Sequence, residues 1–145
     1  MKLQRAPTRA DVERLQAEAA KLPQLELETK HYFADGMYCR EVFRPAGALI
    51  VGKVHKREHF YMVLMGEITV TGDGLPPKTF KAPAILVSAP GTKRAVYAHT
   101  DAVCITVHRT DSRDLDEIER ELVEDDPTAL FDARNHLKAR ELEKL

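Results

Sequence analysis

The chain has 145 residues, a length that fits one domain able to bury a single core. Its composition is that of a globular protein, and a formal net charge of −1 gives no global field favouring nucleic acid or an anionic membrane. No apolar run approaches the roughly 20 residues of a membrane-spanning helix, and the N-terminus lacks the apolar core of a signal peptide. We therefore expect a cytoplasmic protein without membrane or nucleic-acid partners. Cys39 and Cys104 make no disulfide framework, and we expect both to be buried thiols.

Residues 1–24 are expected to form an N-terminal helical segment. Thr8 is a good N-cap, Asp11 follows three residues later, and apolar residues recur at helical spacing up to residue 22. Pro23 ends the pattern. The predicted helix covers residues 8–22.

Residues 25–110 change to the alternation that is typical of β-strands. Short alternating runs are separated by turn signals that contain Gly, Pro and Asp. About eight short strands with turns every 8–12 residues predict a sandwich or a closed barrel. The expected strands are 25–33, 37–43, 48–54, 60–71, 78–81, 84–88, 94–98 and 102–108, and we expect the last two to form a hairpin.

Residues 111–145 are acidic and are expected to form a helical C-terminal tail. Asp111 or Ser112 can cap a helix over residues 114–123. Asp126 followed by Pro127 is a favoured helix start, which predicts a second helix running to near Leu145. Its apolar stripe is thin, so we expect the tail to pack on the barrel or on a partner subunit.

The most informative motif places two histidines at the entrance of a strand. His55 and His59 lie four residues apart, directly before an apolar run that ends at Gly66. In a strand, His59, Tyr61, Val63 and Met65 share one face. Because His is the commonest metal ligand among side chains, His55 and His59 are predicted ligands of Fe, Zn, Mn or Ni at the mouth of a barrel.

A third metal ligand must come from another segment, and two histidines are candidates. His108 shares a face with Arg94 if residues 99–101 form the hairpin loop, whereas a shift of one residue would turn it away. His99 is the other candidate, but it lies an odd number of residues from Arg94 and needs a bulge to point inward.

These residues also resemble the motifs of the cupin family of double-stranded β-helix barrels. Gly47 leads in, and His59, six residues and Gly66 match the Glu-to-Gly spacing of the first cupin motif. His55 matches one of its histidines, and Lys53 stands where the other belongs. The run from Ala89 to Arg94 is similar to the second motif, with Arg94 in place of a histidine. The chain is also similar to small cupin-like proteins of tailed phages and bacteria, and the resemblance implies a cupin barrel that pairs as a homodimer.

Taken at face value, the basic substitutions predict a pocket for an anion. Lys53 and Arg94 would converge with the histidines, and Tyr61 lies on the face of His59. Arg binds carboxylate or phosphate in bidentate fashion, so the ligand would be a carboxylate, a sugar phosphate or a nucleotide. The alternative is that Lys53 and Arg94 extend to the rim of the barrel and contact solvent.

Two further alternatives concern function. Residues 55–59 also satisfy the H-x-x-E-H string of inverted zinc proteases, whose chemistry needs a helix, but the flanking residues are strand-like. The favoured hypothesis is a cupin-type protein that binds a small anionic ligand, with metal-dependent oxygenase, hydrolase or isomerase chemistry if it is an enzyme. The alternative is a non-catalytic ligand sensor or a phage-type accessory protein, and the sequence leaves open whether the chain is an enzyme.

Overall fold

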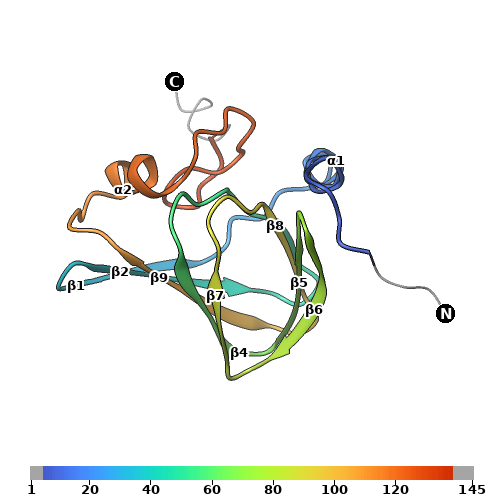
Figure 1. The fold of residues 1–145 in the computed structure, drawn as a ribbon, viewed down its shortest axis with the longest axis horizontal. Coiled ribbons are helices and arrows are strands. Elements are labelled where there is room, and N and C mark those ends of the chain that lie inside the picture. Colours follow the sequence, from blue (N-terminus) through green and yellow to red (C-terminus); the bar gives the residue numbers. More distant parts are fainter. Residues whose placement is uncertain (1–4, 139–145) are drawn as a thin grey trace.

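A computed structural model describes residues 5–138 of the chain, which form a β-barrel with two helices at one end (Figure 1). All strand pairs are antiparallel, in a five-stranded sheet of order β1-β2-β9-β4-β7 and a four-stranded sheet of order β3-β8-β5-β6. In chain order the elements are α1 (Arg9–Ala19), β1 (Thr29–Ala34), β2 (Met37–Arg44), β3 (Leu49–Val51), β4 (His59–Met65), β5 (Glu67–Gly72), β6 (Leu75–Lys81), β7 (Ala84–Ser88), β8 (Arg94–Ala98), β9 (Ala102–Arg109) and α2 (Leu115–Leu122). No helix within residues 5–138 is long and apolar enough to cross a membrane.

Both helices begin at side-chain caps. Thr8 and Asp11 form a capping box, in which each side chain accepts a hydrogen bond from the other residue's backbone N–H. This confirms the predicted start of α1, although the helix ends at Ala19 and not at residue 22. Asp114 caps α2, in place of the expected Asp111 or Ser112.

The core fills the part of the barrel that lies beyond the inward-facing tyrosine of β4. Val63, Ile68 and Ala98 are fully buried, and Cys104 is nearly so. The predicted inner face of β4 is confirmed for His59, Tyr61 and Val63. Met65 is exposed instead, because a bulge shifts the register between β4 and β9 after Val63. Cys39 alternates to the outer face of β2 and is only half-buried, so the expectation of two buried thiols is wrong for Cys39.

The single strand expected over residues 60–71 is two strands in different sheets. Gly66 separates β4 from β5 with a φ of +86°. A Cβ at this position would lie 2.2 Å from the backbone oxygen of Asp101, so only glycine permits the close crossing.

The hairpin expected between residues 94–98 and 102–108 does not form. β8 pairs with β3 and β5, while β9 pairs with β2 and β4 in the other sheet. The short connection over residues 99–101 therefore crosses between sheets, which sequence proximity does not reveal.

The helix predicted from Pro127 towards Leu145 is wrong for the described part of that range, and residues 139–145 lie outside the described residues. Asp126 Oδ1 accepts hydrogen bonds from the backbone N–H and the hydroxyl of Thr128, which closes a turn where a helix was expected. Phe131 and Leu137 then form an isolated antiparallel bridge. The segment packs on the barrel through an ion pair of 3.6 Å between Lys93 Nζ and Asp126 Oδ2.

Candidate metal and ligand site

A cavity of about 590 Å³ is lined by residues of the barrel, of α1 and α2, and of the segment after α2. Figure 1 shows both helices and residues 124–138 at the same end of the barrel. The cavity walls come from both sheets, from the chain after α1, from the apolar face of α2 and from residues 129–135. The volume is in the range of small-molecule sites. Of the residues singled out in the sequence, the cavity is lined by Lys53, His55, His59, Tyr61, Arg94 and His108.

Three histidines converge at this cavity from three segments of the chain. The pairing of Phe60 with Val107 continues so that His59 of β4 faces His108 of β9. His55 precedes β4 and is held by an isolated antiparallel bridge with Val123. Ring centroids lie 4.4 Å apart for His55 and His59, 4.5 Å for His59 and His108, and 5.3 Å for His55 and His108. One nitrogen from each ring lies within 4.8 Å of the others, so the three can meet at one point.

The environment keeps these three imidazoles neutral. The pKa of His55 and of His108 is lowered to about 3, mainly by burial and in smaller part by the neighbouring histidines. Burial also lowers the pKa of His59. Neutral imidazoles retain the nitrogen lone pair that a metal needs.

Hydrogen bonds orient two of the rings. His59 Nδ1 lies 3.2 Å from the carbonyl oxygen of Arg57, which can only accept, so Nδ1 carries the proton and Nε2 is free. His108 Nε2 lies 2.8 Å from Thr106 Oγ1, which leaves Nδ1 of this ring available. Such second contacts fix the tautomer of a ligand histidine.

Arg94 and Lys53, the two basic residues at histidine positions of the cupin motifs, have different surroundings. Arg94 of β8 is partly buried in the cavity wall and donates from Nη1 to Ser88 Oγ. Lys53 Nζ forms an ion pair with Glu119 Oε1 of α2. The charge of Lys53 is therefore balanced by Glu119, whereas Arg94 has no ion pair within residues 5–138.

Tyr61 lies below the histidines, as the next inward residue of β4. Its side chain is buried beside Cys104, a weak acceptor, and its hydroxyl has no nitrogen or oxygen partner in the described part of the chain. Burial raises the pKa of Tyr61, so the phenol stays protonated and can donate.

Sequence reasoning missed two further cavity residues, Arg40 and Arg44 of β2. Both line the cavity, and Nε of each, together with Nη1 of Arg44, is buried without a hydrogen-bond partner among the described residues. The alternation of β2 carries the signal, because Tyr38, Arg40, Val42 and Arg44 share a face. Two arginines at inward positions of a strand indicate a charged interior.

The alternatives raised by the sequence are decided by geometry. His99 does not join the cluster, since its Nε2 lies 2.6 Å from Thr69 Oγ1 on the other sheet. The H-x-x-E-H string does not lie on a helix, because residues 56–58 form an exposed bend before β4. The arrangement needed for an inverted zinc protease is therefore absent from this segment.

The donor set fits a divalent transition metal. Three neutral imidazoles that meet at one point and leave the cavity side open match the three-ligand pattern of catalytic sites. His59 stands at the position where the resemblance places a glutamate, so these ligands bring no negative charge to the metal.

Comparison with known proteins supports the fold. No protein-family model matches the sequence, and no curated protein matches it. Among solved structures, a cupin superfamily protein of Desulfitobacterium hafniense is similar with a TM-score of 0.52 and 14% identity, over 64% of this chain and 87% of that chain. An RmlC-like cupin of Shewanella frigidimarina has a TM-score of 0.51 and 20% identity, over 61% and 79% of the two chains.

Two similar structures are enzymes of greater length. DMSP lyase DddQ of Ruegeria pomeroyi has a TM-score of 0.53 and 18% identity, over 61% of this chain and 49% of the lyase. Salicylate 1,2-dioxygenase of Pseudoaminobacter salicylatoxidans, solved as adducts with gentisate, has a TM-score of 0.51 and 14% identity, over 66% and 29%. At these identities the likeness concerns the fold alone. The chain therefore has the double-stranded β-helix fold of the cupins, as its motifs predicted.

Proposed function

We propose that the protein is a metal-dependent cupin that binds and converts a small anionic molecule in its barrel cavity. The observation that carries the proposal is the convergence of His55, His59 and His108 beside arginines that have no ion pair within residues 5–138. The histidines would hold the metal, and Arg94 would orient the anion. Among the similar structures, a dioxygenase and a lyase have this fold.

The bound metal would supply Lewis-acid or redox chemistry to a substrate in the open part of the cavity. Arg94 and Tyr61 both line the cavity and can donate hydrogen bonds, which suits them to orient a negatively charged group. Lys53 contributes less to anion binding than the sequence predicts, because Glu119 already neutralises it. Residues of α2 and of the segment 129–135 line the cavity and would limit the access of water to a bound ligand.

A second candidate, already raised by the sequence, is a ligand sensor or phage-type accessory protein without turnover. Such a protein would bind its ligand in the same cavity, but it would act by contacting a partner through its surface. The observation that favours a surface role is the apolar outer face of the five-stranded sheet, where alternation directs large side chains to solvent. Phe60, Leu64, Ile85 and Val87 are 50–69% exposed on this face.

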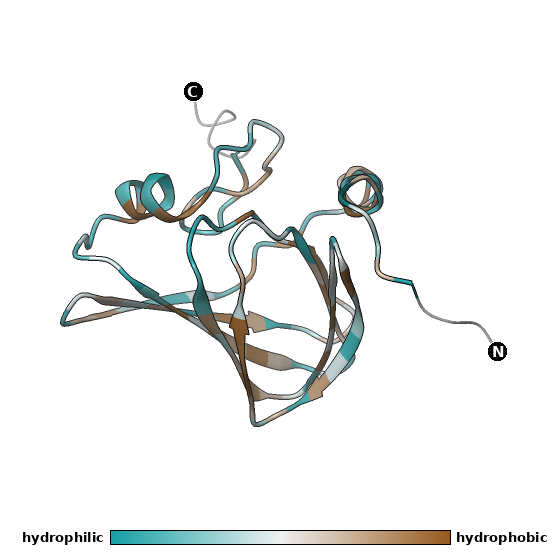
Figure 2. Cartoon of the chain, viewed as in Figure 1, coloured by the Kyte–Doolittle hydropathy of each residue, from teal (hydrophilic) through white to brown (hydrophobic). Residues whose placement is uncertain are grey.

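We further propose that this outer face pairs with a second copy of the chain. Adjacent registers place Val103, Ile105 and Val107 of β9 between β2 and β4, so the apolar surface is continuous across the sheet. β7 is coloured as hydrophobic in Figure 2, whereas α2 is largely hydrophilic. A contiguous exposed apolar face is typical of an interface, and closed two-fold pairing is the commonest form of association.

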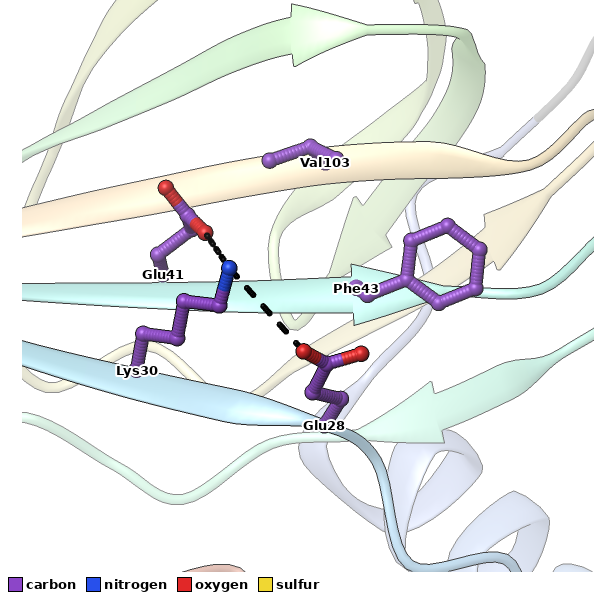
Figure 3. A pocket seen from close by; sticks show the side chains of 5 residues that line it. All are labelled: Glu28, Lys30, Glu41, Phe43 and Val103. Atoms are coloured by element: carbon purple, nitrogen blue, oxygen red, sulfur yellow. Dashed lines mark ion pairs between the residues drawn. The ribbon is translucent and has the colours of Figure 1, made fainter.

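A charged border accompanies this face near β1. Lys30 Nζ lies 3.9 Å from Glu41 Oε2 and 4.0 Å from Glu28 Oε1, in a shallow surface pocket that Phe43 and Val103 also line (Figure 3). An apolar centre with a charged rim is the usual composition of a protein interface.

The direct test of the metal site is elemental mass spectrometry of the purified, untagged protein. We expect about one equivalent of Fe, Zn, Mn or Ni per chain, lost in His55→Ala, His59→Ala and His108→Ala. His99→Ala is the matched control, because His99 lies outside the cluster, and it should retain the metal. Wild-type protein without metal, even after reconstitution with each ion, would refute the metal site.

A turnover assay distinguishes an enzyme from a sensor. Reconstituted wild-type protein is incubated with small carboxylic acids under air and under argon, and substrate loss is followed by mass spectrometry. Turnover that is lost with the metal supports the enzyme. Binding without turnover in both gases supports the sensor.

A further inference from the structure

The cavity holds more positive charge than the described residues neutralise. Arg40, Arg44 and Arg94 line it, and none of them has an ion pair within residues 5–138. Glu119, which is paired with Lys53, and Asp132 act electrostatically on Arg40, and Asp73, which is paired with Arg9, acts on Arg94. Arginine remains charged in proteins, so a buried and unpaired guanidinium costs free energy unless a ligand compensates it.

Two of these arginines act on the same phenol. Both Arg44 and Arg94 interact electrostatically with Tyr61, and they approach it from β2 and β8, which belong to opposite sheets. Arg44 and Tyr61 are each 8% exposed, and Arg44 Nε, Arg44 Nη1 and the Tyr61 hydroxyl have no nitrogen or oxygen partner among the described atoms. Both residues line the cavity, and buried donors without acceptors are uncommon in folded proteins, so they mark this part of the wall as a candidate binding site.

We propose that Arg44, Tyr61 and Arg94 form a subsite for the carboxylate of a small carboxylic acid. The planar fork of Arg44 can bind both carboxylate oxygens, and the Tyr61 hydroxyl donates a further hydrogen bond. The carboxylate would lie below the histidines, so the rest of the acid extends towards them. This inference names the substrate class of the proposed function and rests on it only in treating the cavity as a small-molecule site.

The rest of the cavity wall favours one of the three ligand classes that the sequence left open, which were a carboxylate, a sugar phosphate and a nucleotide. Beyond the arginines and histidines, aliphatic side chains form much of the cavity wall, among them Leu27, Ile50, Leu115, Ile118 and Leu122, beside polar ones such as Gln16, Gln24 and Asn135. The aliphatic part of the wall would leave hydroxyl or base groups of a sugar phosphate or a nucleotide without hydrogen bonds. A carboxylic acid with an apolar body fits both parts of the cavity.

The test is isothermal titration calorimetry of the full chain after removal of metal with EDTA. The probes are acetate, hexanoate and benzoate, with inorganic phosphate and the uncharged benzamide as comparisons. We expect at least one carboxylate to bind with one site per chain, and phosphate and benzamide to bind at least about tenfold more weakly. Arg44→Gln should weaken the carboxylate by about tenfold or more, and Tyr61→Phe by less.

Arg113→Gln is the matched control, because Arg113 is exposed and lies outside the cavity lining. Its affinity should equal that of the wild type. The Tm of the free protein is a second readout, which tests whether Arg44 stabilises the fold. Arg44→Gln removes an uncompensated buried charge, so the Tm should be unchanged or higher. A lower Tm would make Arg44 a structural residue and overturn the proposal.

Three other outcomes would also overturn it: no binding by any carboxylate, equal binding by Arg44→Gln, or tighter binding of phosphate. Failure here is separable from failure of the metal site, because the titration uses metal-free protein. If the protein binds zinc but no carboxylate, only the carboxylate subsite is refuted. If it binds a carboxylate but no zinc, only the metal site is refuted.

Discussion

Lys53 and Glu119 form an ion pair that joins the wall of the cavity to the helix over its mouth. The Lys53 and Glu119 side chains are only 23% and 29% exposed, so the pair is shielded from solvent. Two backbone hydrogen bonds support the same contact, from Lys56 N to Leu122 O at 2.8 Å and from Glu124 N to Val54 O at 2.8 Å. α2 is therefore fixed beside the segment that carries His55.

We expect the Lys53–Glu119 pair to contribute to the docking of α2 more than to anion binding. Lys53→Met and Glu119→Gln should each lower the free energy of unfolding by about 1–3 kcal/mol, because each leaves one partly buried charge without its partner. A double-mutant cycle by urea denaturation measures the coupling between them. A double variant whose loss equals the sum of both single losses would show that the pair is uncoupled.

The histidine cluster predicts a pH dependence of stability in the metal-free protein. Burial lowers the pKa of His55 and His108 to about 3, below the value near 6.5 of an unfolded chain. Between these pH values the unfolded chain binds more protons than the folded protein. The contribution of the neutral histidines to the free energy of unfolding is therefore complete above pH 6.5 and is lost as the pH falls towards 3. The slope is at most roughly 1.4 kcal/mol per pH unit for each histidine.

Urea denaturation in EDTA between pH 4.5 and 8 measures this slope. Carboxylates also titrate in the acidic part of the range, so the comparison with His55→Gln and His108→Gln is decisive. Each variant should show a flatter profile than the wild type. Parallel profiles would mean that these histidines are protonated in the folded protein.

Metal and carboxylate should bind cooperatively. The three histidines are neutral, and Arg40 and Arg94 lie close enough to lower histidine pKa values in the cluster, so a divalent ion meets uncompensated positive charge. A bound carboxylate offsets that charge, and we expect it to tighten zinc binding by about tenfold, equivalent to roughly 1.4 kcal/mol.

Competition with a chromophoric chelator, with and without saturating carboxylate, measures this coupling. Arg44→Gln should bind zinc with an affinity that carboxylate does not change. A carboxylate effect that persists in Arg44→Gln would place the anion elsewhere.

The outer face of the five-stranded sheet predicts a dimer that a single charge disrupts. Ile85 is 69% exposed and Phe60 is 52% exposed, on neighbouring strands. Ile85→Glu should convert a dimer into a monomer by light scattering, because burial of an unpaired carboxylate opposes association. Tyr97→Glu is the control, since Tyr97 is 42% exposed on β8 of the four-stranded sheet and lies outside the cavity lining. A monomeric wild type at micromolar concentration would contradict the prediction.

Local patterns in the sequence determined much of the fold and half of the site. Alternation and turn residues predicted the strands, the capping residues predicted α1, and the motif spacing identified the cupin fold. His55, His59 and Tyr61 were found because they lie in one short segment, where side-chain direction follows from the period of a strand.

Only the tertiary structure decided which distant residues meet. The pairing of β9 with β4 brought His108 to the cluster and excluded His99, although both lie near Arg94 in sequence. Lys53 was expected to bind the ligand, but α2 brings Glu119 to it from 66 residues away. Arg40 and Arg44 became visible as cavity residues once β2 was placed beside β9.

The physical reason for this division is the range of the interactions. Periodicity, caps and glycine turns act between residues a few positions apart, so the sequence shows them directly. Strand pairing, the meeting of three imidazoles and the pairing of buried charges depend on how the two sheets close around a common core. That closure balances many weak contacts between distant segments, and a single sequence does not reveal its outcome.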